Sequence, residues 1–201
     1  MTELKVTDAD RAYLEWLNRA EPKGWRKFID VQIPYRWNIR RLNPGRVLEV
    51  GAGVGRHLAH FASGSVGVEM NRAALQALRS KLLRAFHPEE FHSSVEAQPE
   101  AFDSLLFSHV AEHMTVEEFT RCVESYLRYI KKGGQLIVIC PQEKGYATDR
   151  THVQFMDHDT IWTAVATLGL IEERRYSFPF PRWAGRLFTH NEFVSTFRRA
   201  H

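Results

Sequence analysis

The sequence predicts an α/β fold: a doubly wound, seven-stranded and mostly parallel sheet with helices on both faces and an antiparallel last strand. From residue 47 onward, short apolar runs typical of buried strands alternate with stretches in which apolar residues recur at helical spacing. Strands that are joined by helices run parallel, so this alternation implies a sheet between two helical layers. The last two apolar runs, 170–178 and 192–199, have no helix between them, which predicts an antiparallel hairpin at one edge.

Length and composition narrow the class of protein. The 201 residues suit one domain, in which we expect residues 1–44 to form an N-terminal helical cap on an α/β core at 45–201. Two cysteines, Cys122 and Cys140, exclude a disulfide framework. No apolar run reaches the ~18 residues of a membrane span, and the N-terminus lacks an apolar signal core, so we expect a cytoplasmic protein. A net charge of +3, spread along the chain, allows an anionic ligand and argues against nucleic acid.

Two segments precede the core. Residues 8–20 predict an amphipathic helix with Asp8 as its N-cap. Residues 25–42 are aromatic and basic, are interrupted by Pro34, and end in the turn 43–45. We expect the first two segments to form a helical lid beside the substrate pocket.

The core elements follow in order along the chain. Apolar runs predict the five strands before the final hairpin at 47–50, 65–69, 91–95, 102–108 and 135–140. Helical spacing predicts helices from the glycine-rich turn to residue 62, from Asn71 through Leu82, from Thr115 to Gly133, and at 159–168. Thr115 and Glu118 form the sequence of a capping box. Ligands of such sheets bind at the carboxyl ends of the strands, so the loops at that edge are the candidate site.

The most specific motif is the stretch VLEVGAGVGRHL. Gly51, Gly53 and Gly55 allow a sharp turn and a close approach of a ligand to the backbone. Glu69 ends the next predicted strand, where a carboxylate can accept two hydrogen bonds from a ribose diol. The spacing G-x-G-x-G, with Glu49 two residues before it, differs from the G-x-G-x-x-G of dinucleotide oxidoreductases. An oxidoreductase and a glycine turn without a ligand stay open as alternatives.

The stretch EVGAGVG and the acid after the next strand resemble motif I and the ribose-binding acid of class I S-adenosylmethionine-dependent methyltransferases. The resemblance covers residues 45–140 and implies a Rossmann-like fold with S-adenosylmethionine as the cofactor. It places Glu49 near the methionine moiety and Glu96–Ala97 along the adenine. The implied cofactor site consists of Glu49, Gly51, Ala52, Gly53, Gly55, Glu69, Met70, Glu96, Ala97 and Ser108. Arg36 is a further candidate, for the cofactor carboxylate, although a solvated arginine fits that position equally well.

A histidine-rich stretch, FSHVAEHM, follows the fourth predicted strand. His109, Glu112 and His113 are spaced to share one face of a helical turn. His152 lies with Asp149 in the polar loop after the fifth strand, which ends at the same edge of the sheet. Imidazoles and a carboxylate suit a divalent metal. The alternatives are a metal-free general base, chosen among His152, His109 and His113, and histidines that only make structural hydrogen bonds.

This stretch is similar to the E-x-x-E-H pattern of ubiquinone-pathway O-methyltransferases and of enzymes that methylate the terminal 2′-hydroxyl of small RNAs. Both groups hold a metal against vicinal hydroxyls, so the resemblance implies the metal set His109, Glu112, His113 and His152. The chain departs from the pattern at His109, which replaces a glutamate. One negative charge less weakens Mg²⁺ binding, because Mg²⁺ prefers oxygen ligands. The choice between Mg²⁺ and another divalent metal therefore stays open.

Two longer stretches, FIDVQIPYRWNIRRLNPGRVLEVGAGVGRHL and PQEKGYATDRTHVQFMDHD, resemble small actinobacterial methyltransferases. One branch of that group methylates mannoside hydroxyls in polymethylated polysaccharide synthesis, so the resemblance implies a sugar O-methyltransferase. A phenolic or quinone-like acceptor is the alternative, because a phenol with a pKa of about 10 needs less help from a base. A catalytically inactive cofactor-binding partner protein is another alternative. A homodimer through the aromatic N-terminal segment is also allowed.

Overall fold

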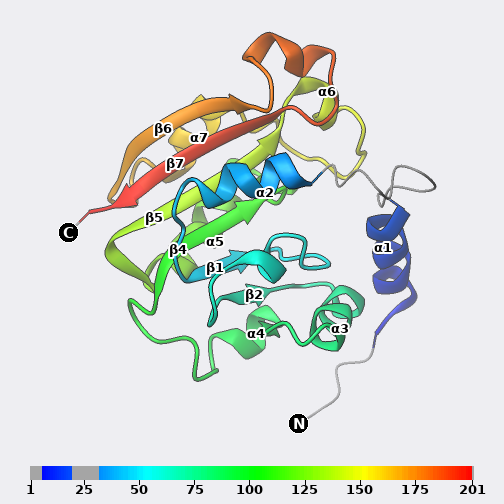
Figure 1. Ribbon diagram of the computed structural model, residues 1–201, viewed down its shortest axis with the longest axis vertical. Coiled ribbons are helices and arrows are strands. Elements are labelled where there is room, and N and C mark those ends of the chain that lie inside the picture. The colour runs from blue at the N-terminus through cyan, green and yellow to red at the C-terminus, as the bar shows by residue number, and fades with distance from the viewer. Residues whose placement is uncertain (1–5, 20–31, 201) are drawn as a thin grey trace.

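The computed structural model describes residues 6–19 and 32–200, and these form the predicted sheet of seven strands in the order β3-β2-β1-β4-β5-β7-β6 (Figure 1). The strands are β1 Val47–Val50, β2 Val66–Val68, β3 Ala85–Phe86, β4 Phe102–Ser108, β5 Ile130–Pro141, β6 Leu170–Phe178 and β7 Glu192–Arg199. The first five pair in parallel, whereas β7 lies between β5 and β6 and is antiparallel to both. The predicted α/β architecture with its antiparallel last strand is confirmed.

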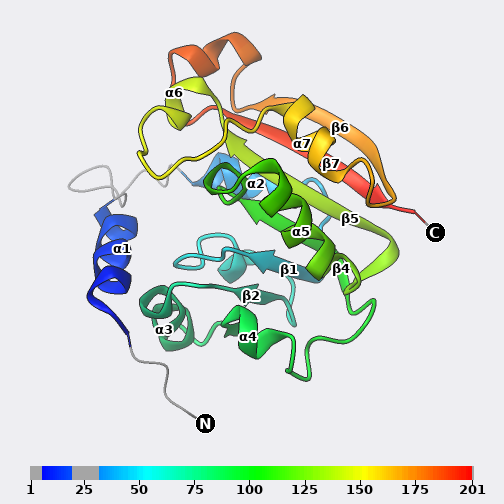
Figure 2. The same cartoon turned by 180° about the vertical axis from the view of Figure 1, so that it is seen from behind.

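Helices cover both faces of the sheet. They are α1 Asp8–Arg19, α2 Ile33–Arg40, α3 Arg72–Ser80, α4 Pro88–Phe91, α5 Val116–Leu127, α6 Glu143–Tyr146 and α7 His158–Val165, with 3-10 turns η2 Leu58–His60, η3 Ala111–His113 and η4 Arg182–Arg186. Helix α2 lies on one face, and α5 and α7 lie on the other (Figures 1 and 2). None of the helices within the described ranges is long and apolar enough to cross a membrane. Residues 25–31 of the predicted aromatic segment lie outside the described residues.

The side chains of β4 alternate between the two cores. Phe107 packs with Phe119 of α5 on one face, whereas Leu106 packs in the cluster that contains Ile39 of α2 on the other. Full burial of one such side chain contributes roughly 1.5–3 kcal/mol. Because both faces are covered, the central strands are fixed, and their carboxyl ends form a rigid edge from which the loops of the site emerge.

Two predicted helix starts are confirmed. The side chain of Asn71 accepts a hydrogen bond from the N–H of Ala74 at 2.9 Å and caps α3. Thr115 and Glu118 exchange the two bonds of a capping box at the start of α5, 2.9 and 3.2 Å long. Both caps satisfy amide groups that the first helical turn leaves without a partner.

The predicted third strand at 91–95 is wrong. The third strand is the short β3, and the helix α4 begins directly after it at Pro88. Proline suits the first helical turn because its missing N–H has no helical partner there, and Glu89 and Glu90 favour the positive end of the helix dipole. Phe91 therefore fills the core from a helix rather than from a strand.

Several helix ends also differ from the prediction. In place of the helix predicted after the glycine-rich turn, the structure has only the 3-10 turn η2, because most of the residues before it form the turn itself. Helix α3 ends at Ser80, and Leu82 is left-handed, at φ 60°, and almost fully exposed. Helix α5 ends before β5, and Gly134 lies inside that strand, where a side chain would clash with the carbonyl of Asp103. The last helix is α7, which ends four residues before Gly169.

Candidate functional site

The glycine-rich loop leaves the carboxyl end of β1. The N–H groups of Gly51 and Ala52 both donate to the carbonyl of Val68 at the end of β2, at 2.8 and 3.1 Å. Gly51 has φ 76°, and a Cβ atom there would lie 2.3 Å from a methyl group of Val110. Only glycine fits at this position, which holds the turn against the chain that follows β4.

Glu69 lies one residue beyond β2 and closes the other side of the loop. Its two carboxylate oxygens accept hydrogen bonds from the N–H groups of Gly53 and Asn71, both at 2.7 Å. Burial raises the pKa of Glu69, although the amides of Asn71 and Gly53 oppose that shift. A carboxylate has about four lone-pair sites, so Glu69 can accept from ribose hydroxyls as well as from backbone amides.

Glu49 is buried beneath the same loop. Burial raises its pKa to about 8, which the amide of Leu58 opposes and the nearby Glu69 reinforces. One of its oxygens, Oε2, has no hydrogen-bond partner among the described residues. An unpartnered buried oxygen is costly, and a positively charged ligand near the loop would relieve that cost.

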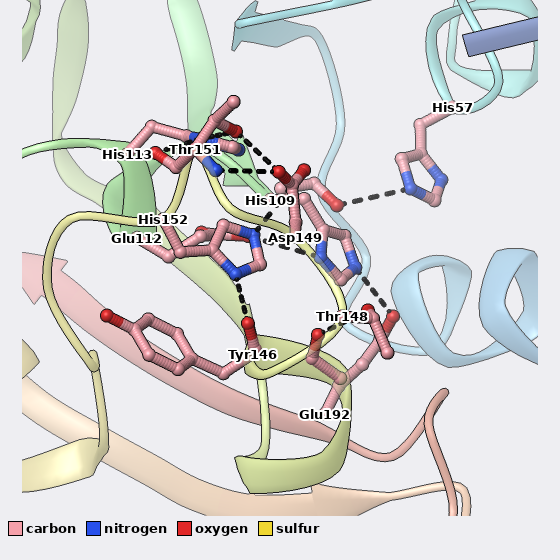
Figure 3. A network of polar contacts seen from close by, with 12 residues as sticks. His57, His109, Glu112, His113, Tyr146, Thr148, Asp149, Thr151, His152 and Glu192 are labelled. Atoms are coloured by element: carbon pink, nitrogen blue, oxygen red, sulfur yellow. Dashed lines mark hydrogen bonds and ion pairs between the residues drawn. The ribbon is translucent and has the colours of Figure 1, made fainter. Parts of the chain in front are cut away.

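Three other predicted cofactor residues lie around this loop. Met70 follows Glu69 directly and is mostly exposed. Ser108 ends β4, and its hydroxyl lies 3.3 Å from Nε2 of His57 (Figure 3). Arg36 of α2 is near enough for its charge to act on that histidine. Burial, together with the charges of its neighbours, lowers the pKa of His57 to about 3, so the ring is neutral.

The structure does not bring Glu96 to the loop. Its carboxylate is bound by Arg46, at 2.5 Å, and by Arg84. Arg46 precedes β1 and Arg84 precedes β3, so Glu96, with Ala97 beside it, lies at the amino ends of the strands. His87 instead follows β3 at the carboxyl edge, and its charge acts on Glu69. In the sequence, His87 is marked by the residues that follow it, a proline and two acids that begin α4.

The histidine cluster forms where β4, β5 and β7 meet (Figure 3). His109 lies between two acids: its Nε2 is 2.9 Å from Glu192, and its Nδ1 is 3.3 Å from Glu112. Desolvation on the protein side opposes a charge on His109, whose side chain is 45% exposed, but these two carboxylates raise its pKa to about 10. The ring is therefore a cation, held in a left-handed backbone conformation at φ 56°. Such strain in a residue other than glycine persists only where its surroundings fix it.

His152 occupies the other side of Glu112. Its Nδ1 donates to the carbonyl of Tyr146 at 2.7 Å, which leaves Nε2 directed at two acids, 4.0 Å from both Glu112 and Asp149. His113 packs against His152 with ring centroids 4.8 Å apart. The structure therefore brings His109, Glu112, His113 and His152 together, with Asp149 beside them.

The cluster contains donors that suit a divalent metal. One atom each from Glu112, His113 and His152 lie within 4.8 Å of one another. Neither carboxylate oxygen of Glu112 has a hydrogen bond of good geometry among the described residues, although the side chain is fully buried. Two imidazoles and one carboxylate are typical ligands for zinc, manganese or iron. The residues fit a metal of that kind.

Glu192 is the residue of this cluster that the sequence analysis missed. It is the first residue of β7 and pairs with Pro141 at the end of β5. The sequence could have predicted its place in the site, because the first residue of an antiparallel strand lies at the edge of the sheet where the neighbouring parallel strands end. His57 was missed as well, since nothing in the loop sequence separates it from an ordinary surface histidine.

Comparison with known proteins agrees with this geometry. Residues 48–138 match the family model described as a methyltransferase domain. The matched region runs from β1 into β5 and is similar to a methyltransferase domain. No curated protein matches the chain in sequence.

Solved structures show the same fold at low identity. A SAM-dependent methyltransferase from Archaeoglobus fulgidus is 16% identical, with 87% of this chain and 97% of that chain covered and a TM-score of 0.62. Magnesium protoporphyrin IX methyltransferase from Synechocystis, with bound SAM, is 11% identical over 98% and 100% of the two chains, at a TM-score of 0.61. A chain from the complex between the Haloferax volcanii Trm112 methyltransferase activator and a methyltransferase is 14% identical over 98% of each chain, at 0.70.

Proposed function

We propose that the protein transfers the methyl group of S-adenosylmethionine to a hydroxyl of a sugar or oligosaccharide, with a mannoside as the first acceptor to test. One observation carries the proposal. A histidine nitrogen, Nε2 of His152, faces two acids at the same edge of the sheet as the glycine loop. A sugar hydroxyl is a weak acid and needs a base or a metal when it attacks, whereas many other methyl acceptors do not.

The donor side of the site would hold the cofactor through the loop after β1. Glu69 would accept the ribose hydroxyls, while the turn at Gly51 and Gly53 lets the backbone approach the methionine part. Arg36 would meet the cofactor carboxylate, and Met70 and Ser108 would border the pocket. The bound cofactor supplies a methyl group on a positively charged sulfur, which is already a good leaving group. The protein therefore contributes mainly alignment on this side.

The acceptor side would remove the proton. The hydrogen bond to Tyr146 fixes the tautomer of His152, so Nε2 carries the lone pair that accepts the hydroxyl proton while the oxygen–methyl bond forms. Glu112 and Asp149 would stabilise the resulting imidazolium. His109 is already a cation between two acids, so we assign it a positioning role rather than that of the base.

A divalent metal would act at the same place. Glu112, His113 and His152 would hold it, and its chemistry when bound is to lower the pKa of an acceptor hydroxyl. His109 would not be a ligand in this arrangement, because both of its nitrogens already contact carboxylates. Two nitrogen donors favour manganese or zinc over magnesium.

The first experiment is calorimetric titration with S-adenosylhomocysteine, followed by methyl-transfer assays on mannosides and simple phenols with Mg²⁺, Mn²⁺ or EDTA present. We expect donor-product binding that is independent of metal, and turnover of a mannoside. His152→Ala should remove turnover and leave binding intact, whereas His92→Ala, outside the cluster, should change neither. Absent binding by a folded protein contradicts the donor site. Binding with turnover of phenols alone contradicts only the sugar acceptor.

A further inference from the structure

The loop that joins β6 to β7 presents apolar side chains to water. This loop, residues 178–191, includes η4 and projects beside α6 (orange in Figure 1). Within it Leu187 is 75% exposed, Trp183 is 68% exposed and Phe180 is 50% exposed. Single exposed apolar residues are common on protein surfaces, but several on one projecting loop mark an interaction surface.

The inside of the same loop is polar and tightly fastened. The amide of Asn191 donates to Gln142 at 2.9 Å and accepts from the N–H of Phe180 at 2.9 Å, and the side chains of Gln142 and Asn191 are completely buried. Gly185 packs so closely on Gln142 that it has no room for a side chain. This buried hydrogen-bond network fixes the loop and occupies its inner side. The apolar side chains are therefore left on its outer side.

A second clamp lies beside this network. Arg182 donates two hydrogen bonds to the carboxylate of Glu143 on α6, 2.7 and 2.5 Å long. This bidentate ion pair joins the loop to α6, and the charges of Arg182 and Glu143 neutralise each other. The loop and α6 therefore form one rigid projection, which we call the β6–β7 projection.

The charge of the projection is positive. Residues 178–191 contain no aspartate or glutamate. Arg186 in the loop and Lys144 on α6 are both exposed. Tryptophan, leucine and phenylalanine flanked by basic residues are the composition of surfaces that lie in the interface of an anionic bilayer.

We propose that the β6–β7 projection docks the protein on an anionic lipid surface, with Trp183 and Leu187 entering the interfacial region and Arg186 and Lys144 meeting lipid phosphates. The loop projects from the body of the molecule beside α6 (Figure 1), which suits insertion between headgroups. The proposal goes beyond the methyl-transfer function and does not depend on it, because it concerns only where the protein is held.

The test is co-sedimentation of the full chain with vesicles of phosphatidylcholine alone and of phosphatidylcholine mixed with phosphatidylglycerol. We expect binding to the mixed vesicles that weakens at high salt. The double variant Trp183→Ala/Leu187→Ala should lower the partition coefficient at least about tenfold. Its matched control, Leu82→Ala/Ile171→Ala, removes two exposed apolar side chains elsewhere and should bind as the wild type does.

The electrostatic part is tested separately. Arg186→Ala should weaken binding to the mixed vesicles about fivefold, since one basic residue near such a surface contributes about that factor. Lys132→Ala, exposed at the amino edge of the sheet, is its control. Thermal melts of all variants establish that they fold.

Three results would overturn the proposal. The first is wild-type binding to vesicles by the double variant. The second is no binding of the wild type to either kind of vesicle. The third is self-association of the wild type in sedimentation velocity that Trp183→Ala/Leu187→Ala abolishes, which would make the projection an interface between copies of the chain.

Discussion

The glycine loop and the histidine cluster lie at the same edge of the sheet, but they are assembled differently. The loop and its acid come from one continuous stretch, Val47 to Asn71, and close on themselves through hydrogen bonds between Gly53, Glu69 and Asn71. The cluster joins three separate segments, and its contact between His109 and Glu192 spans 83 positions of sequence. The comparison teaches that a local motif predicts a binding loop, whereas a catalytic cluster depends on the register of distant strands.

The two regions also differ in the groups that surround their buried acids. Glu49 under the glycine loop lies near another acid, and its pKa is raised to about 8. Glu112 in the cluster lies 3.3 Å from one imidazole and 4.0 Å from another. Burial and the charge of Glu69 keep the first carboxyl protonated near neutral pH, whereas the second has two imidazoles within 4.0 Å.

The largest effect is expected from Glu112→Gln. This isosteric change removes the acid between His109 and His152, and we expect turnover to fall by about 10²–10⁴-fold, the usual contribution of acid–base machinery. Binding of S-adenosylhomocysteine should not change, because the glycine loop is intact. Rates and calorimetric affinities are measured for this variant and for Glu117→Gln, an exposed control on α5. Normal turnover in the variant would remove the cluster from the chemistry.

The second effect is expected from Glu69→Ala, which acts on the other region. The loss of two hydrogen bonds to a charged acceptor should weaken S-adenosylhomocysteine binding by about 10–100-fold. The anchor of Gly53 is lost at the same time, so the loop also becomes less ordered. Calorimetry on this variant and on Glu89→Ala, an exposed acid after β3, measures the difference. Equal affinities would show that the ribose is bound elsewhere.

A pH-dependent effect is expected from Glu49. The unfolded chain releases the proton of this residue above its ordinary pKa of 4.5, whereas the folded protein keeps it until about pH 8. The folded state therefore binds more protons in this window, and the free energy of unfolding falls by about 1 kcal/mol per pH unit as pH rises. Denaturant titrations of the wild type and Glu49→Gln across this range test it. The variant should lose that slope, and an unchanged slope would assign the dependence to other groups.

The smallest effect is expected from Leu82→Gly. Leu82 adopts φ 60° just after α3 and is almost fully exposed. Its side chain therefore contributes little packing energy, while its Cβ strains the left-handed backbone. Glycine at this position should raise the free energy of unfolding by about 0.5–1 kcal/mol. Thermal melts measure the change, with Leu82→Ala as the control that keeps the strain. A loss of stability in the glycine variant would show that the exposed leucine has a contact that outweighs the strain.

The structure differs from the sequence-based expectation at two places, for two different physical reasons. Residues 91–95 have the composition of a strand, but Pro88 and the acids after it begin a helix that puts Phe91 into the core. The resemblance implies that Glu96 lines the adenine, yet two arginines hold it at the opposite edge of the sheet. In the first case a local helix start outweighed the strand composition, and in the second a tertiary contact placed the side chain.

By itself, the sequence determined the alternation of strands and helices, the glycine turn, and the caps of α3 and α5. These features depend on neighbours in the chain, on periodicity and on backbone freedom, all of which can be read from a linear string. Only the tertiary structure decided that Glu192 meets His109, that His152 faces Glu112, and that Trp183 and Leu187 face water. Those outcomes depend on strand register and on the packing of segments far apart in sequence, where one shifted residue would exchange the buried and the exposed face.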